Sequence, residues 1–158
     1  MCYIMPLGAN YNAMVSSILS TKGNELDLKY IVENNGKFVF LTTRTINNEN
    51  IEKFLRSFYD FVYLYTGSRN PNIEILELPD ENNIAIITNF LRENLISIVK
   101  DYKKVILNIT PSTKGIICSC LLVLLELESE LELVYVASKV RDKQGRSLSV
   151  ETSYRYRP

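Results

Sequence analysis

The stretch KVILNITPSTKGIICSCLLVLL, residues 104–125, decides the fold of this chain. Its first part is branched and apolar, which is typical of a buried β-strand, so we predict a strand from Lys104 to Ile109. A polar turn follows, and the apolar run from Ser112 to about Leu125 is long enough for a buried helix. A buried strand that leads through a short turn into a buried helix is the repeating unit of an α/β protein.

The rest of the chain repeats this alternation of apolar strands and amphipathic helices. We expect further strands at residues 3–7, 37–43, 72–78 and 131–137, and helices at residues 10–20, 47–65 and after Asp80, which can cap its helix. The helix after Asp80 would place Ile84, Ile87, Leu91, Leu95 and Ile98 on one face. The sequence therefore predicts a Rossmann-like, doubly wound α/β fold with a mainly parallel sheet and helices on both faces.

Two segments are less clear. Leu26, Leu28, Tyr30 and Val32 alternate with other residues over 26–32, which fits either a strand paired to residues 37–43 or a short helix. Residues 139–158, with a turn at 143–145, look like a basic C-terminal hairpin or tail attached to a core formed by residues 1–138. A strand at 26–32 would change the order of strands in the sheet.

Charge is unevenly distributed although the net charge is zero. Residues 1–138 carry 12 basic and 16 acidic side chains, whereas residues 139–158 carry six basic and two acidic ones. The basic tail is either a contact for a small anionic ligand or a solvated edge. Zero net charge argues against a general nucleic-acid coat protein, and we expect no duplex DNA partner for this domain alone.

Composition removes several classes of function. The 158 residues contain no histidine, which excludes Ser-His-Asp triads, Cys-His dyads and histidine acid–base catalysis. Three cysteines without any histidine argue against a zinc site, so we expect reduced thiols and no metal. There is no apolar run of about 18 residues and no signal peptide, so we expect a cytoplasmic protein without a membrane partner.

In the common strand order, the first and fourth strands are neighbours, and ligands bind just beyond their carboxyl ends. The loops there are Gly8-Ala9-Asn10 and Thr110-Pro111-Ser112-Thr113-Lys114. The second loop supplies hydroxyls, the free N–H groups of a helix start and a lysine charge, which suit phosphate. The same residues also suit an ordinary helix cap, and Asn10 can equally cap its own helix. Neither a P-loop nor a Gly-x-Gly-x-x-Gly motif is present.

Three short motifs resemble CARF domains (the CRISPR-associated Rossmann fold). Residues 108–114, Asn-Ile-Thr-Pro-Ser-Thr-Lys, are similar to the family form Asn-hydrophobic-Thr-Gly-Gly-Thr-Lys, with Pro111-Ser112 in place of Gly-Gly. Residues 141–146, Arg-Asp-Lys-Gln-Gly-Arg, resemble the Arg-Asp-x-x-Gly-Arg stretch often found at the end of such domains. Pro6-Leu7-Gly8 fits the family's first ligand loop. The resemblance spans almost the whole chain.

The resemblance implies a homodimer that binds a cyclic oligoadenylate, most often the tetramer, across its two-fold axis in type III CRISPR signalling. A stand-alone member resembles the ring nucleases, which cut the messenger by attack of a ribose 2′-OH and need neither metal nor cofactor. For a ring nuclease, the resemblance implies that Lys114 stabilises the developing negative charge and that Asn10 or Ser112 aligns the reacting groups. The expected ligand contacts are Gly8, Ala9, Thr110, Pro111 and Thr113, with Lys139 and Arg141 as weaker phosphate contacts.

Two other functions stay open. The chain is alternatively a sensor that binds the ring without cutting it, as one domain of a longer effector or transcription regulator. Without the resemblance it is a generic nucleotide-binding α/β protein.

Overall fold

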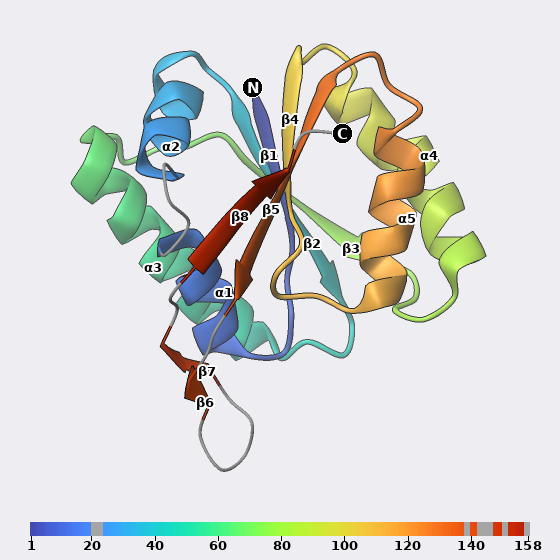
Figure 1. Cartoon of the computed structure of the whole chain (residues 1–158), viewed down its shortest axis with the longest axis horizontal. Coiled ribbons are helices and arrows are strands. Elements are labelled where there is room, and N and C mark those ends of the chain that lie inside the picture. Colours follow the sequence, from blue (N-terminus) through green and yellow to red (C-terminus); the bar gives the residue numbers. More distant parts are fainter. Residues whose placement is uncertain (20–23, 138–139, 142–146, 150–151, 157–158) are drawn as a thin grey trace.

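The computed structural model describes residues 1–19, 24–137, 140–141, 147–149 and 152–156. Six strands form one sheet in the order β3-β2-β1-β4-β5-β8, which lies between two layers of helices (Figure 1). The first five strands run parallel and β8 runs antiparallel to β5. The bounds are β1 Cys2–Pro6, β2 Lys37–Thr43, β3 Ile73–Leu78, β4 Lys104–Asn108, β5 Glu130–Ala137 and β8 Thr152–Tyr156.

Five helices cover the two faces of the sheet. One face carries α1 Tyr11–Leu19, α2 Asn24–Glu33 and α3 Asn48–Thr66, and the other carries α4 Ile84–Val99 and α5 Lys114–Leu124 (Figure 1). Helices on both faces of a mainly parallel sheet confirm the predicted Rossmann-like, doubly wound α/β fold.

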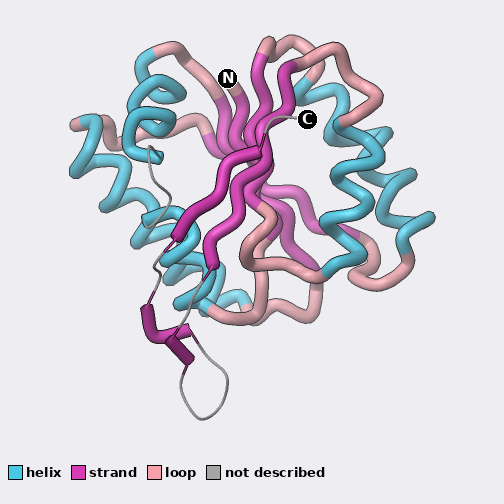
Figure 2. The backbone as a smooth tube through the Cα atoms, viewed as in Figure 1, coloured by secondary structure: helices cyan, strands magenta, loops and turns pink. Residues whose placement is uncertain are grey.

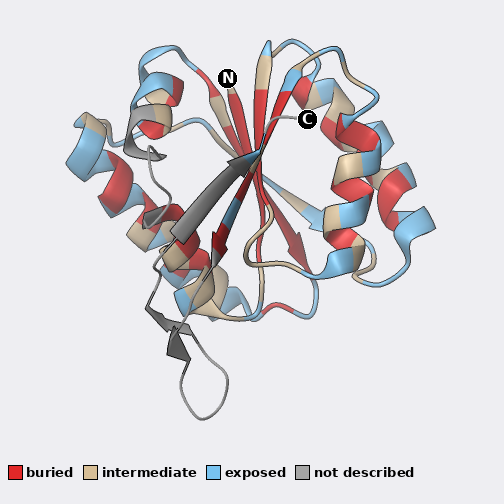
Figure 3. Ribbon diagram, viewed as in Figure 1, coloured by how far each residue is buried: buried red, intermediate tan, exposed pale blue. Residues whose placement is uncertain are grey.

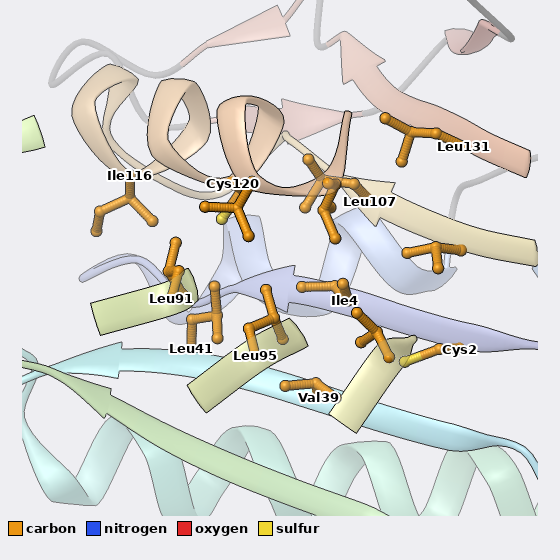
Figure 4. Packing of buried hydrophobic residues seen from close by; sticks show 14 of the residues in the cluster. Cys2, Ile4, Val39, Leu41, Leu91, Leu95, Leu107, Ile116, Cys120 and Leu131 are labelled. Atoms are coloured by element: carbon orange, nitrogen blue, oxygen red, sulfur yellow. The ribbon is translucent and has the colours of Figure 1, made fainter. Parts of the chain in front are cut away.

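Each face of the sheet has its own apolar core, and the central strands are buried on both sides (Figure 3). Alternate residues of β1 separate the cores: Ile4 packs toward α4 and α5, whereas Tyr3 and Met5 pack toward α1, α2 and α3. Figure 4 shows the first core, in which Leu91, Leu95 and Cys120 from the helices meet Val39, Leu107 and Leu131 from the strands. The continuous apolar runs of the sequence therefore do mark strands that are covered on both faces.

Aromatic rings dominate the second core. Phe40 meets Phe54 and Phe58 edge to face, with ring centroids 5.1 Å apart in both pairs, and Phe38 meets Phe58 at 5.0 Å. These contacts hold α3 against β2, and pairs of this geometry contribute about 0.5–1.5 kcal/mol each beyond area burial. Asn47 caps α3 by accepting a hydrogen bond from the N–H of Glu49, and Gly67 ends it with a φ of 72°.

Residues 26–32, which fitted two secondary structures, lie in helix α2. Leu28 and Ile31 are fully buried against the sheet, so packing selects the helix. Because no strand is inserted here, β1 pairs with both β2 and β4, as the predicted switch point requires.

Two expectations about α4 were wrong. Asn83, not Asp80, caps the helix by accepting a hydrogen bond from the N–H of Ile86 at 3.2 Å. Asp80 instead accepts hydrogen bonds from the N–H groups of Asn82 and Asn83, which lower the pKa of its carboxyl. Ile84 was expected on the buried face, but it is the first residue of α4 and is 43% exposed.

The C-terminal region contains two strand pairs. β6 Val140–Arg141 and β7 Ser147–Ser149 pair antiparallel, which confirms the predicted hairpin, although its turn at 143–145 lies outside the described residues. β8 then adds an antiparallel edge strand that the sequence analysis did not predict, with Thr152 opposite Ala137. None of the helices in the described ranges is long and apolar enough to cross a membrane.

Candidate functional site

The loops that follow β1, β2, β3 and β4 meet at one end of the sheet (Figure 2). β1 and β4 are neighbours in register, with Tyr3 opposite Ile106 and Ile4 opposite Leu107. Neighbouring parallel strands end at the same edge of the sheet. The strands that follow each of them in the chain, β2 and β5, lie on opposite sides of this pair. The predicted meeting of the β1 and β4 loops is therefore confirmed.

Gly8 and Pro111 form a close contact between these two loops. A Cβ atom built on Gly8 would lie 1.8 Å from the carbonyl oxygen of Pro111, which no side chain can tolerate. Leu7, just before it, donates its N–H to the carbonyl oxygen of Leu41 at 2.7 Å. Gly8 is therefore present because the loops touch, backbone to backbone.

Asn108, the last residue of β4, is fully buried and holds the junction together. Its Nδ2 donates to the Tyr3 hydroxyl at 2.9 Å and to the carbonyl oxygen of Ser17 at 3.3 Å. Its Oδ1 accepts the N–H of Thr110 at 3.0 Å. One amide thus links β4, β1, α1 and the start of the β4 loop, so the asparagine of the motif has a positioning role.

The hydroxyls of the β4 loop differ in their partners. Thr110 Oγ1 accepts the N–H of Val136 at 2.9 Å, which ties the loop to β5. Thr113 donates its hydroxyl to the carbonyl oxygen of Glu81 at 3.3 Å, which ties the loop to the β3 loop. Ser112 Oγ is buried and has no hydrogen-bond partner among the described residues. Of the three hydroxyls, those of Thr110 and Thr113 are therefore engaged in holding the loop, and that of Ser112 is not.

Helix α5 begins two residues later than expected. The sequence suggested a start at Ser112, but Thr113 is extended, with φ −73° and ψ 154°, and the helix begins at Lys114. The hydrogen bonds of Thr110 and Thr113 tie the loop before the helix to β5 and to the β3 loop. Thr113 makes no side-chain cap, so its side chain leaves the first N–H groups of α5 available as hydrogen-bond donors.

A depression of about 260 Å³ lies between the loops, and we call it the switch-point pocket. The walls combine apolar and polar residues from all four loops. They are Leu7, Gly8, Ala9, Thr43, Thr45, Ile46, Glu81, Pro111, Ser112, Thr113 and Ile116. Ligand sites commonly have this combination of apolar walls with a few converging polar groups.

The structure brings together only some of the residues expected at a site. Gly8, Ala9, Pro111, Ser112 and Thr113 line the switch-point pocket. The remaining candidates from the two loops, Asn10, Thr110 and Lys114, lie beside it without lining it.

The two proposed catalytic residues outside the pocket have distinct surroundings. Asn10 Oδ1 accepts the N–H of Ala13 at 3.2 Å, so Asn10 caps α1. Lys114 is exposed in the first turn of α5 and forms no ion pair with any residue that the structure describes. Lys139 lies outside the described residues, and for Arg141 the backbone of β6 is described but the side chain is not.

Sequence reasoning missed the β2 and β3 loops. Thr43, Thr45, Ile46 and Glu81 line the pocket although none of them was a candidate. The signal was available, because Thr43 ends a predicted central strand and Glu81 closely follows the next one, so both reach the same edge. The neighbouring depression, also about 260 Å³, shares Thr43, Thr45 and Glu81 and extends the pocket toward Arg44 and Pro79.

No family model and no curated protein matches the chain. Among solved structures, the chain is similar to Csm6 of Enterococcus italicus bound to cyclic hexa-2′-fluoro-hexa-dAMP, with a TM-score of 0.57 and 15% identity. The match covers 90% of this chain and 34% of Csm6. A second match is Can2 from Sulfobacillus thermosulfidooxidans in complex with cyclic tetra-adenylate, with a TM-score of 0.49, 14% identity, and coverage of 86% and 32%.

The chain thus spans about a third of the length of either protein. At this identity, the similarity to Csm6 is evidence about the fold and not about the activity. Together with the strand order and the two neighbouring loops, it shows that this chain shares a Rossmann-like α/β fold with that part of Csm6.

Proposed function

We propose that this protein binds a cyclic oligoadenylate at the switch-point pocket, as a homodimer in which two pockets face one ring. The observation that carries the proposal is the pocket itself, where Gly8 and Pro111 touch and the buried Ser112 Oγ lacks a partner among the described residues. Csm6, the neighbour that shares the fold, is bound to a cyclic hexanucleotide, and that ligand supports the choice of ligand class to test.

A two-fold dimer suits a ring with an even number of nucleotides, because both copies can make the same contacts with it. Each copy brings the first N–H groups of α5, the Ser112 hydroxyl and the Lys114 ammonium group to one side of the ring. The N–H groups and the helix dipole favour an anion, and Lys114 adds a full positive charge. These groups support binding of the phosphates.

We further propose that the protein cuts the ring. A ribose 2′-OH loses its proton to water and attacks the adjacent phosphorus, the bond to the 5′ oxygen breaks, and that oxygen takes up a proton from water. The product is a 2′,3′-cyclic phosphate with a free 5′-OH. The reaction needs in-line alignment and stabilisation of the developing negative charge. Ser112 would align the scissile phosphate, Asn10 the 2′-OH, and Lys114 would stabilise the charge. Lys139 and Arg141 would add phosphate contacts from the C-terminal segment.

Incubation of the protein with cyclic tetra-adenylate in EDTA tests this proposal. We expect linear products that end in a 2′,3′-cyclic phosphate, separated by chromatography. A ring that stays intact under enzyme excess would overturn cleavage, and calorimetry that detects no binding would overturn the site. Light scattering with and without the ring measures whether a dimer forms.

A second candidate function is a sensor that binds the ring without cutting it. The positions of the proposed catalytic residues favour this candidate: Asn10 already caps α1 and Lys114 does not line the pocket. A sensor would bind the ring tightly and release it unchanged, so the same incubation separates the two functions.

A further inference from the structure

The switch-point pocket contains a carboxylate opposite the β4 loop. Thr45 Oγ1 lies 2.5 Å from the Glu81 carboxylate, and the Thr43 and Thr45 hydroxyl oxygens are 2.9 Å apart. A carboxylate accepts hydrogen bonds and does not donate, so the Thr45 proton points to Glu81. The Thr43 hydroxyl, which belongs to a buried residue, therefore donates to Thr45. These hydrogen bonds join the Glu81 carboxylate to the end of β2 at the exposed rim of the pocket.

A carboxylate is unexpected in the wall of a site for an anionic ring. It repels phosphate oxygens, so the part of the ring that meets Glu81 must carry a hydrogen-bond donor. A cyclic oligoadenylate has two kinds of donor, the ribose 2′-OH and the 6-amino group of adenine. A favourable contact between Glu81 and the ring therefore requires one of these two groups.

The apolar part of the pocket favours the base over the sugar. Leu7, Ile46, Pro111 and Ile116 line the same depression as Glu81. A purine has flat apolar faces that suit such walls, whereas a ribose would leave its hydroxyls against them without partners. Ser112, whose buried Oγ has no hydrogen-bond partner among the described residues, belongs to the same wall.

We infer that Glu81 is a specificity-determining residue that accepts a hydrogen bond from the 6-amino group of an adenine seated in the switch-point pocket. Thr45 is a positioning residue, which acts by holding the Glu81 carboxylate. This inference rests on the proposed binding of cyclic oligoadenylate and does not depend on cleavage.

The test compares two synthetic rings, cyclic tetra-adenylate and the same ring built from purine riboside, which lacks the 6-amino groups. Wild-type protein should prefer the amino ring by roughly tenfold or more, the size of one hydrogen bond to a charged acceptor. Glu81→Leu should still bind both rings but lose the preference. Glu77→Leu removes an exposed carboxylate outside the pocket, paired with Arg44, and should keep the preference as the control.

Thr45 supplies a second test that does not remove the carboxylate. Thr45→Val keeps the shape of the side chain but removes the hydroxyl, and should reduce the preference between the rings. Thr45→Ser retains the hydroxyl and should restore it. This pair also tests the inference if Glu81→Leu does not fold, which circular dichroism would show.

Three outcomes would overturn the inference. Glu81→Leu could keep the full preference for the amino ring. It could instead lose the distinction between the ribose ring and a 2′-deoxyribose ring, which would place Glu81 against the sugar. Wild-type protein could also bind cyclic tetra-adenylate without any preference for the amino group, which would refute the role of Glu81 but leave the proposed function standing. Failure of the wild-type protein to bind either ring would refute both.

Discussion

The Asn108 side chain donates a hydrogen bond to the Tyr3 hydroxyl at 2.9 Å, so side chains as well as backbone join β4 to β1. The same amide accepts the N–H of Thr110 and sets the direction in which the β4 loop leaves the sheet. The edge that carries the candidate site is therefore held by a buried polar group on the face of the sheet that α1 covers.

Removing this amide should destabilise the fold. We expect Asn108→Ala to lower the free energy of unfolding by about 3 kcal/mol, because it leaves buried polar groups unpaired. Tyr3→Phe removes one partner only and should cost about 1 kcal/mol. Chemical denaturation of both variants and of the double mutant measures the coupling, and strictly additive effects would contradict a direct contact.

Gly8 should not tolerate any side chain. Gly8→Ala would place a Cβ 1.8 Å from the backbone oxygen of Pro111, so we expect a loss of about 3 kcal/mol and a displaced loop with weakened ring binding. Gly115→Ala is the matched control, because its Cβ would meet its nearest neighbour at an ordinary 3.4 Å. As a helix residue, alanine should leave stability unchanged or raise it by up to about 1 kcal/mol. Equal melting temperatures for the two variants would refute the close contact.

Lys114 should matter for cleavage more than for stability. It is exposed and unpaired among the described residues, so Lys114→Ala should leave the melting temperature within about 1 °C. If Lys114 stabilises charge in the transition state, single-turnover cleavage should fall by roughly 100-fold or more. Lys53→Ala, which removes a surface lysine paired with Glu49, is the control and should cleave normally. Unchanged cleavage in Lys114→Ala would remove this residue from the mechanism.

The three thiols should differ sharply in reactivity. Burial raises the pKa of Cys2 and of Cys120 to about 12, whereas Cys118 is exposed. Because the thiolate is the reactive form, a thiol reagent such as DTNB at pH 8 should modify Cys118 quickly in the native protein. The other two thiols should react only after denaturation, and Cys118→Ser should abolish the fast phase. Rapid reaction of two or more thiols in the folded protein would contradict the described burial.

Much of the fold was predictable because strands buried on both faces have a simple pattern. The apolar runs of β1, β2 and β4 identified the central strands, and the helical spacing of Phe54, Phe58 and Val62 identified α3. Residues 26–32 could not be assigned, since their alternation fits two structures and only packing against the sheet selects the helix. Strand β8 was missed because an edge strand has no continuous apolar run to mark it.

The candidate site was predictable in its place but only partly in its members. The two glycine- and threonine-bearing loops follow the strands that flank the switch point, and they do meet. The roles of individual polar side chains were not predictable. The Thr110 hydroxyl accepts a hydrogen bond from Val136, and the Thr113 hydroxyl donates one to Glu81, so both partners are distant in sequence. The Ser112 hydroxyl has no partner among the described residues.

The sequence by itself determined the alternation of strands and helices, because burial on two faces and helical periodicity are properties of neighbouring residues. It also determined that histidine chemistry is absent. Only the tertiary structure decided which loops form the pocket walls, and it placed Glu81 and Thr45 opposite Ser112. A pocket wall depends on contacts between residues far apart in the chain, and those contacts exist only once the sheet has brought the carboxyl ends of its strands together.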